Sequence, residues 1–119
     1  MLLQTGVEQR KFPRVAFRSP IKIRLPEGDM DMGELAQDIS LGGIRVRSTD
    51  FVPLGSVLRV MVQFSAEEKT VEVRARVVWV RYFPQSEVYQ LGLEFVGEMP
   101  LTGERIAVFV RSRQKGRDL

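Results

Sequence analysis

Two arginines near the start of the chain have the chemistry to hold an anionic, planar ligand. Arg10 and Arg14 lie four positions apart, just before the first alternation of apolar residues. A guanidinium group donates paired, coplanar hydrogen bonds that fit phosphate oxygens or the O6/N7 edge of guanine. The spacing alone says little, because Arg-x-x-x-Arg recurs at Arg14/Arg18 and at Arg113/Arg117.

A second segment, residues 38–43 with the sequence DISLGG, offers complementary groups. An ionised Asp38 only accepts hydrogen bonds, and guanine presents matching donors at N1 and at its exocyclic amine, while Ser40 can both donate and accept. Gly43 has no Cβ, so a ligand could approach its backbone closely. The same pattern also occurs where Asp or Ser simply caps a turn before Gly-Gly.

The elements that must position these residues follow from hydropathy periodicity. Apolar and polar residues alternate with the period of a half-buried strand in six places, and the last segment changes to a helical period. The predicted strands cover 15–25, 34–40, 44–47, 58–64, 71–79 and 89–95, and the predicted helix covers 101–114. Near the end of the fifth strand Val78 and Val80 are apolar on the opposite parity, so both faces are buried there or the strand is bulged.

Six short antiparallel strands tend to close into a barrel, because closure removes exposed edges. The chain of 119 residues is the size of one domain. We therefore predict an all-β fold, a six-stranded antiparallel β-barrel with a C-terminal α-helix. Residues 1–14 would form a mobile N-terminal arm, 15–114 the barrel with its helix, and 115–119 a tail.

Composition excludes most catalytic classes. The chain has no cysteine and no histidine, which rules out disulfides, Cys/His zinc sites and nucleophile pairs that use histidine. It also lacks a Gly-rich phosphate loop, a metal-ligating cluster and an acid/base pair, so we expect no enzyme, no metal and no cofactor. No apolar run suits a secretory signal or a membrane span, and we expect a cytoplasmic protein.

The combination of motifs resembles the PilZ domain family. An Arg-x-x-x-Arg arm precedes the first strand, Asp-x-Ser-x-x-Gly closes the second, and the segments ARVVW (75–79) and LGLEF (91–95) look like later strands of that family. The resemblance runs from about Glu8 to the helix. It implies a six-stranded barrel that binds the bacterial second messenger cyclic di-GMP, with phosphate and guanine held by Arg10 and Arg14 and a guanine received by Asp38, Ser40 and Gly43.

The resemblance also marks weaker site candidates, which are Gln9, Lys11, Gly42 and Trp79. Lys11 stands where many members have arginine. An arginine at the position of Gln9 tends to accompany binding of a stacked ligand dimer, so one or two ligands per chain stay open. Members often place a side chain of the fifth strand beside the ligand, but Trp79 shares its strand with Val77 and could equally be core.

The expected function is a receptor whose arm closes on cyclic di-GMP and which signals through an unidentified effector protein, in motility, pilus or biofilm control. One alternative is a PilZ-like adaptor that acts by protein contact without nucleotide. Another is a barrel that binds single-stranded nucleic acid, through a stripe formed by Arg45, Arg47, Arg59, Arg74 and Arg76. Aromatic residues are only 8%, and we expect these arginines to pair with Glu72 or Asp50 or to face solvent, so nucleic acid is disfavoured. A homodimer through strand edges or the helix stays open.

Overall fold

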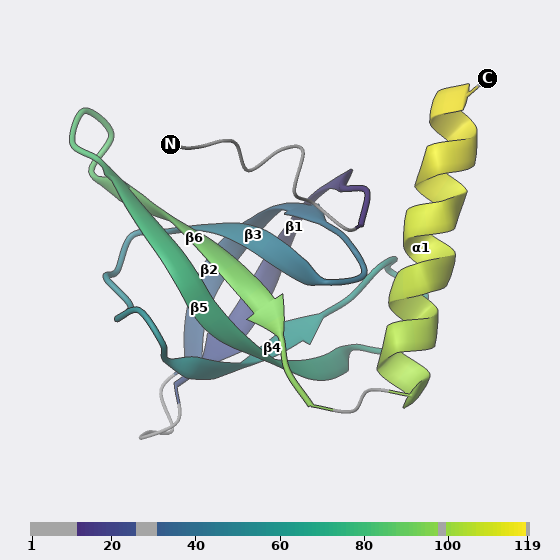
Figure 1. Ribbon diagram of the computed structural model, residues 1–119, viewed down its shortest axis with the longest axis horizontal. Helices are drawn as coiled ribbons and strands as arrows, with labels where there is room; N and C mark the ends of the chain where they lie inside the picture. The colour runs from purple at the N-terminus through teal and green to yellow at the C-terminus, as the bar shows by residue number, and fades with distance from the viewer. Residues whose placement is uncertain (1–11, 26–30, 98–99, 119) are drawn as a thin grey trace.

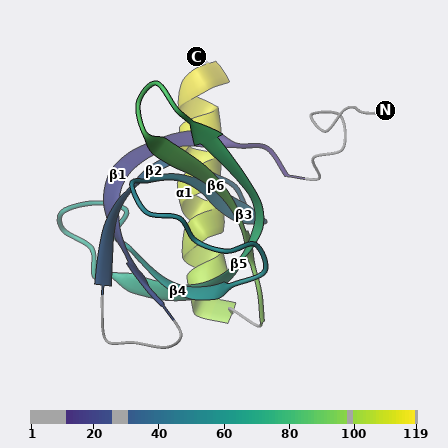
Figure 2. The ribbon, with the colours of Figure 1, turned by 90° about the vertical axis from the view of Figure 1, so that its left-hand side faces the viewer.

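Six strands form a closed antiparallel ring with one helix beside it, in a computed structural model that describes residues 12–25, 31–97 and 100–118 (Figure 1). Around the ring the order is β1-β2-β3-β6-β5-β4, and β1 closes it by pairing with β4. The view in Figure 2 faces this ring, with α1 behind it. The bounds are β1 Val15–Arg24, β2 Asp31–Ile39, β3 Gly43–Ser48, β4 Val57–Val62, β5 Val71–Phe83, β6 Val88–Phe95 and α1 Pro100–Asp118. The predicted fold class is thus confirmed.

The barrel core consists of the apolar residues that alternate along each strand. In β1 the side chains of Val15, Phe17, Ile21 and Ile23 are buried, while Arg18 and its neighbours on the other parity face outward. The same alternation buries one face of β3 and of β4. Removing these apolar surfaces from water is the main favourable term for folding.

An aromatic cluster attaches α1 to the barrel. The ring of Phe109 on α1 lies 5.1 Å from that of Phe17 on β1 and 5.0 Å from that of Phe64, centroid to centroid. Ile106 and Val110, one turn apart on the same side of the helix, are also buried. The helical period of the sequence therefore marks the face that packs.

Three boundaries differ from the prediction by more than two residues, and the others agree within two. β2 begins at Asp31 instead of residue 34, and α1 continues to Asp118, so residues 115–118 belong to the helix and not to a tail. No proline follows Pro100 in the sequence to end the helix. β5 runs to Phe83 because β6 pairs with it that far, and its register shifts between Val77 and Trp79. This shift is a β-bulge, one of the two alternatives predicted for the end of this strand.

Candidate ligand-binding site

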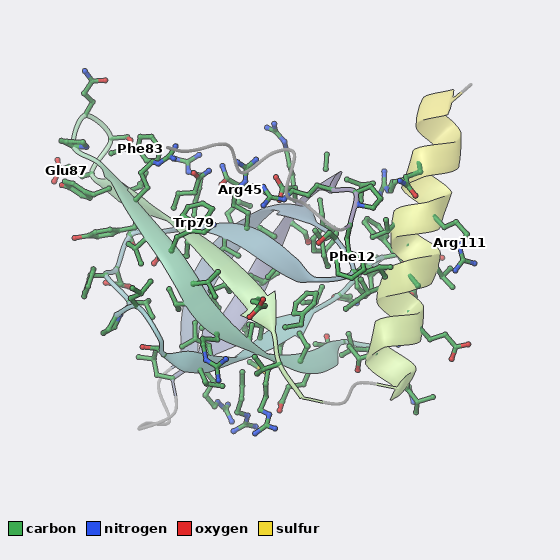
Figure 3. The ribbon with its side chains drawn as sticks, viewed as in Figure 1. Phe12, Arg45, Trp79, Phe83, Glu87 and Arg111 are labelled. Carbon is green, nitrogen blue, oxygen red and sulfur yellow. The ribbon has the colours of Figure 1, made fainter. Side chains whose placement is uncertain are left out.

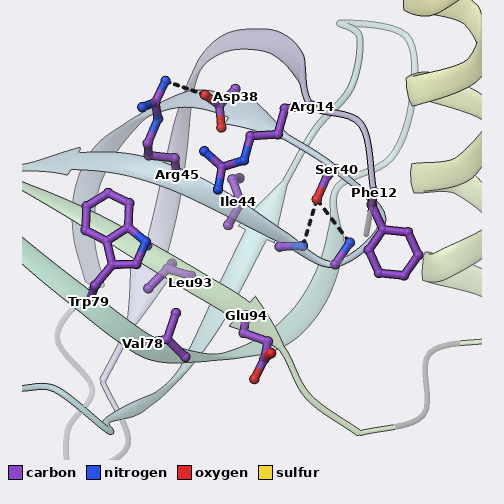
Figure 4. Close-up of a pocket in the computed structure, with 13 residues that line it drawn as sticks. Phe12, Arg14, Asp38, Ser40, Ile44, Arg45, Val78, Trp79, Leu93 and Glu94 are labelled. Carbon is purple, nitrogen blue, oxygen red and sulfur yellow. Dashed lines mark hydrogen bonds and ion pairs between the residues drawn. The ribbon is translucent and has the colours of Figure 1, made fainter. Parts of the chain in front are cut away.

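The predicted site residues meet at one cavity of about 170 Å³ on the outer surface of the barrel (Figure 4). All six of them that the structure describes line it, and they come from the segment before β1, the end of β2 with the turn into β3, and β5. They are Arg14, Asp38, Ser40, Gly42, Gly43 and Trp79. Gln9, Arg10 and Lys11 lie outside the described residues.

Ser40 closes the β2–β3 turn with its hydroxyl. The backbone N–H groups of Gly42 and Gly43 donate to Ser40 Oγ over 3.1 Å and 3.2 Å, and the Ser40 N–H donates to the Gly43 carbonyl over 2.9 Å. The simple turn-capping explanation therefore applies to Ser40, whose side chain is buried while it lines the cavity. Its hydrogen bonds fix the backbone of the turn.

Different neighbours occupy the space that a side chain would need at the two glycines of the turn. A Cβ on Gly43 would lie 2.1 Å from the Leu93 carbonyl oxygen on β6, so the close approach at this position is made by a neighbouring strand. A Cβ on Gly42 would lie 2.8 Å from the ring of Phe12. Phe12 thus rests on Gly42 and brings the arm to the turn, two residues before Arg14.

Asp38 is buried and forms an ion pair with Arg45 of β3. Arg45 Nη2 lies 2.5 Å from Asp38 Oδ2, and the two side chains are 36% and 13% exposed (Figure 4). A carboxylate has two oxygens and can accept further hydrogen bonds besides this pair. The Nε of Arg45 is buried and has no hydrogen-bond partner among the described residues. Arg45 thus lines the cavity while its Nε is covered by the surrounding residues.

Trp79 faces the cavity and not the core. The bulge after Val77 places Trp79 opposite Gly92, and the indole covers the spot where a Gly92 side chain would stand, with Nε1 2.1 Å from that position. The ring is half-buried, and the Arg81 guanidinium lies 5.9 Å from its centroid. The core alternative for Trp79 is wrong, because the bulge reverses the parity shared with Val77.

A second hollow of about 740 Å³ adjoins the cavity and shares Arg14, Asp38, Arg45 and Trp79 with it. Figure 3 shows Arg45 and Trp79 on the same side of the barrel. Arginines dominate the charge of this hollow: Arg14, Arg18, Arg45 and Arg81 face one carboxylate, that of Asp38. Such a surface suits an anionic ligand.

Sequence reasoning missed Phe12, Arg45 and Arg81 as site residues. Phe12 lies inside the arm motif and Arg45 follows Gly43 by two positions, so proximity in sequence was the only available signal. Arg45 was expected to pair with Glu72 or Asp50 or to face solvent, and it pairs with Asp38. Arg59 pairs with Glu72, Nε to Oε2 over 3.1 Å, as expected. That hydrogen bond lowers the pKa of Glu72.

In the described part of the chain no helix is long and apolar enough to cross a membrane.

Comparison with known proteins places these observations in a family. The model of the PilZ domain matches residues 8–112. The fold is similar to that of the Bacillus subtilis inhibitor of motility MotI/DgrA, at TM-score 0.75 and 23% identity over 91% of this chain and 52% of that one. It is also similar to Escherichia coli YcgR in complex with cyclic di-GMP, at TM-score 0.74 and 14% identity over 92% and 48%.

A third similar structure is the K. pneumonia MrkH complex with cyclic di-GMP, at TM-score 0.67 and 18% identity over 89% of this chain and 55% of that one. The chain thus spans about half the length of these three proteins. No relative with a curated description matches the sequence. At these identities the likeness establishes the fold.

Proposed function

Because the chain belongs to the PilZ domain family, a family of non-catalytic cyclic di-GMP receptor domains, we propose that it binds cyclic di-GMP at the cavity beneath Phe12. The observation that supports this most is the meeting of three separate segments at one cavity, each bringing a group suited to part of the ligand. Arg14 would donate to phosphate, Asp38 would accept from guanine, and Trp79 would offer a ring face to the base.

The cavity is too small for the whole ligand, which suggests a role for the N-terminal arm. Its volume of about 170 Å³ is below the usual range of roughly 300–1,000 Å³ for small-molecule sites, so it suits one base and not a whole dinucleotide. The remainder of the ligand would lie over the adjoining arginine-lined hollow. Residues 1–14, with Arg10 among them, would close over it and exchange conformational entropy for charge-assisted hydrogen bonds.

Closure of the arm would supply the signal. The ligand would increase the population of the closed conformation, and a partner protein that binds only this conformation would respond to it. No covalent chemistry is required. Since MotI is named an inhibitor of motility, we place the partner in motility or biofilm control, in the cytoplasm. The nucleic-acid alternative loses support, because Arg45 and Arg59 of its stripe are already paired with carboxylates.

Calorimetric titration with cyclic di-GMP tests this function. Arg14→Ala and Asp38→Ala should each weaken binding about 10- to 150-fold, the equivalent of a charge-assisted hydrogen bond of about 1.5–3 kcal/mol. Arg111→Ala, on the exposed side of α1 (Figure 3), and Asp50→Ala, also exposed, are matched controls that should bind as the wild type does. Absence of binding heat for the wild type would favour the nucleotide-free adaptor, and equal binding by Arg14→Ala would place the site elsewhere.

A further inference from the structure

The second half of β5 pairs with only one neighbour. β4 pairs with β5 from Val71 to Arg76, and the loop before β4 adds two hydrogen bonds at Val77. Beyond that point β5 pairs with β6 alone, and the two strands leave the ring as a hairpin (Figure 1). Residues 78–83, here named the open β5 edge, have no backbone partner on their other side within the described part of the chain.

Hydrogen-bond alternation identifies the free groups. The Phe95 N–H donates to the Gly42 carbonyl, so odd-numbered residues of β6 direct their backbone groups toward β3 and even-numbered ones toward β5. Gly92, Gln90 and Val88 are opposite Trp79, Arg81 and Phe83. The N–H and C=O groups of Val80 and Tyr82 therefore point away from β6, toward the open edge.

The composition of the open β5 edge is unusual for an unpaired strand. Its sequence, VWVRYF, has one charge and no proline, although proteins normally protect exposed edges with charged residues and proline. Val78, Tyr82 and Phe83 are 44%, 47% and 39% exposed. These are residues that favour strand pairing, so the edge is preformed for strand addition.

Aromatic rings extend this apolar surface beside the edge. The Tyr82 ring lies 4.7 Å from that of Tyr89, which lies 5.7 Å from that of Phe51 in the loop after β3. Tyr82 and Tyr89 continue the inward parity of their strands toward the end of the barrel, where Tyr89 is half-buried and Tyr82 is exposed. Phe83 lies on the other face of the hairpin, near its tip (Figure 3).

The charge and the apolar area of the open β5 edge indicate which kind of molecule would bind to it. The exposed side chains of Arg76 and Arg81 form no ion pair with any described residue, and the carboxylate of Glu72 is taken by Arg59. A second copy would bring its own arginines to the same edge. The exposed parts of Phe51, Tyr82 and Phe83 amount to roughly 300 Å², well below the roughly 800 Å² per partner of a stable interface.

We propose that the open β5 edge binds an extended segment of a partner protein, in which acidic residues alternate with apolar ones. The segment would add as a strand along Val80 and Tyr82, place apolar side chains against the aromatic rings and direct a carboxylate toward Arg81. Main-chain hydrogen bonds would give affinity, and the alternation would give specificity. Trp79 and Arg81 of this edge also line the hollow proposed for the nucleotide, so the segment is titrated in the absence of nucleotide.

NMR titration of the full chain, labelled with ¹⁵N, tests the proposal with a blocked octapeptide that alternates valine and glutamate. The amide signals of Val80 and Tyr82 should shift in a saturable manner, and a peptide that alternates valine and lysine should bind at least about tenfold more weakly. Backbone N-methylation of the glutamate peptide should abolish the shifts. Arg81→Glu should reverse the preference between the two peptides, and Arg111→Glu should leave it unchanged.

Four results would overturn the proposal. One is the absence of saturable shifts, and another is shifts confined to Gly42 and Gly43 at the cavity. A third is slow amide exchange at Val80 and Tyr82 in a peptide-free monomer, which would mean that the chain itself covers the edge. The fourth is the same protection in a dimer detected by sedimentation, which would make a second copy the occupant.

Discussion

Replacing Gly43 with alanine should destabilise the barrel, whereas the same change at Gly42 should weaken ligand binding and leave stability nearly intact. The two residues are adjacent and both line the cavity. They differ in what a new methyl group would meet. At Gly43 it meets the β6 backbone at Leu93, and at Gly42 it meets the far end of the Phe12 side chain.

The magnitude at Gly43 follows from the contact distance. A Cβ 2.1 Å from the Leu93 oxygen forces β3 and β6 apart, because a distance below 3.0 Å is essentially never seen for a Cβ. The adjacent hydrogen bond, from Phe95 N to Gly42 O at 2.9 Å, would stretch out of range. Overpacking of about 1–3 kcal/mol and a lost hydrogen bond of about 1 kcal/mol together predict a loss of about 2–4 kcal/mol.

At Gly42 the Phe12 ring, 40% exposed, can move aside, and the backbone has no positive φ that alanine would strain. The free energy of unfolding should therefore change by less than about 1 kcal/mol. Displacing Phe12 removes the contact that holds residues 12–14 on the turn, and ordering this segment on binding would cost about 0.5–1.5 kcal/mol more, a two- to twelvefold loss of affinity.

Urea denaturation and calorimetric titration of both variants separate the two effects. The expected pattern is a lower denaturation midpoint for Gly43→Ala alone and weaker cyclic di-GMP binding by the folded Gly42→Ala protein. If Gly43→Ala were as stable as the wild type, the close packing of β3 on β6 would be wrong. If Gly42→Ala lost as much stability as Gly43→Ala, Phe12 would not be the movable neighbour.

Three other predictions concern the site, the helix and pH. Trp79→Ala should weaken cyclic di-GMP binding by about 1–3 kcal/mol, the contribution of one base stack, in the same calorimetric assay, and a wild-type affinity would refute that contact. Phe109→Ala should lower the free energy of unfolding in urea by about 3 kcal/mol, while Val108→Ala, 57% exposed, should change it little; equal effects would contradict the packing of α1. Glu72→Gln should cost up to about 0.5 kcal/mol at pH 7, a small effect because the Arg59 pair is exposed. The pKa of Glu72 is lowered in the folded state. The difference in free energy of unfolding between the wild type and Glu72→Gln should therefore be constant above pH 4.5 and disappear as the pH falls below that value. A difference that persists in acid would refute the ion-pair origin.

The barrel was predictable because period-2 alternation records which face of each strand is buried. Val15 to Ile23 in β1 shows this directly, since its buried residues all share one parity. The length of β5 was not predictable, because its last residues pair with β6 beyond the barrel and gain no burial that would mark them. The bulge also reversed the parity of Trp79, an effect that depends on the register against Gly92.

The cavity was predictable only in part. Motif residues separated in sequence were brought together as the family resemblance implied, including Arg14 and Asp38. The roles of Arg45 and Phe12 depend on contacts between segments, with Asp38 and Gly42 respectively. The need for glycine at position 43 also depends on a contact between segments. The β6 backbone leaves no room for a Cβ there, so no ligand is needed to explain the residue.

Fluorescence of Trp79 tests the central claim most directly, because it is the only tryptophan in the chain and lines the cavity. Addition of cyclic di-GMP should change the Trp79 emission in a saturable manner at micromolar concentrations, and Asp38→Ala should move the midpoint to at least tenfold higher ligand while Asp50→Ala leaves it unchanged. An emission that stays constant while calorimetry detects binding would place the ligand away from this cavity and contradict the account.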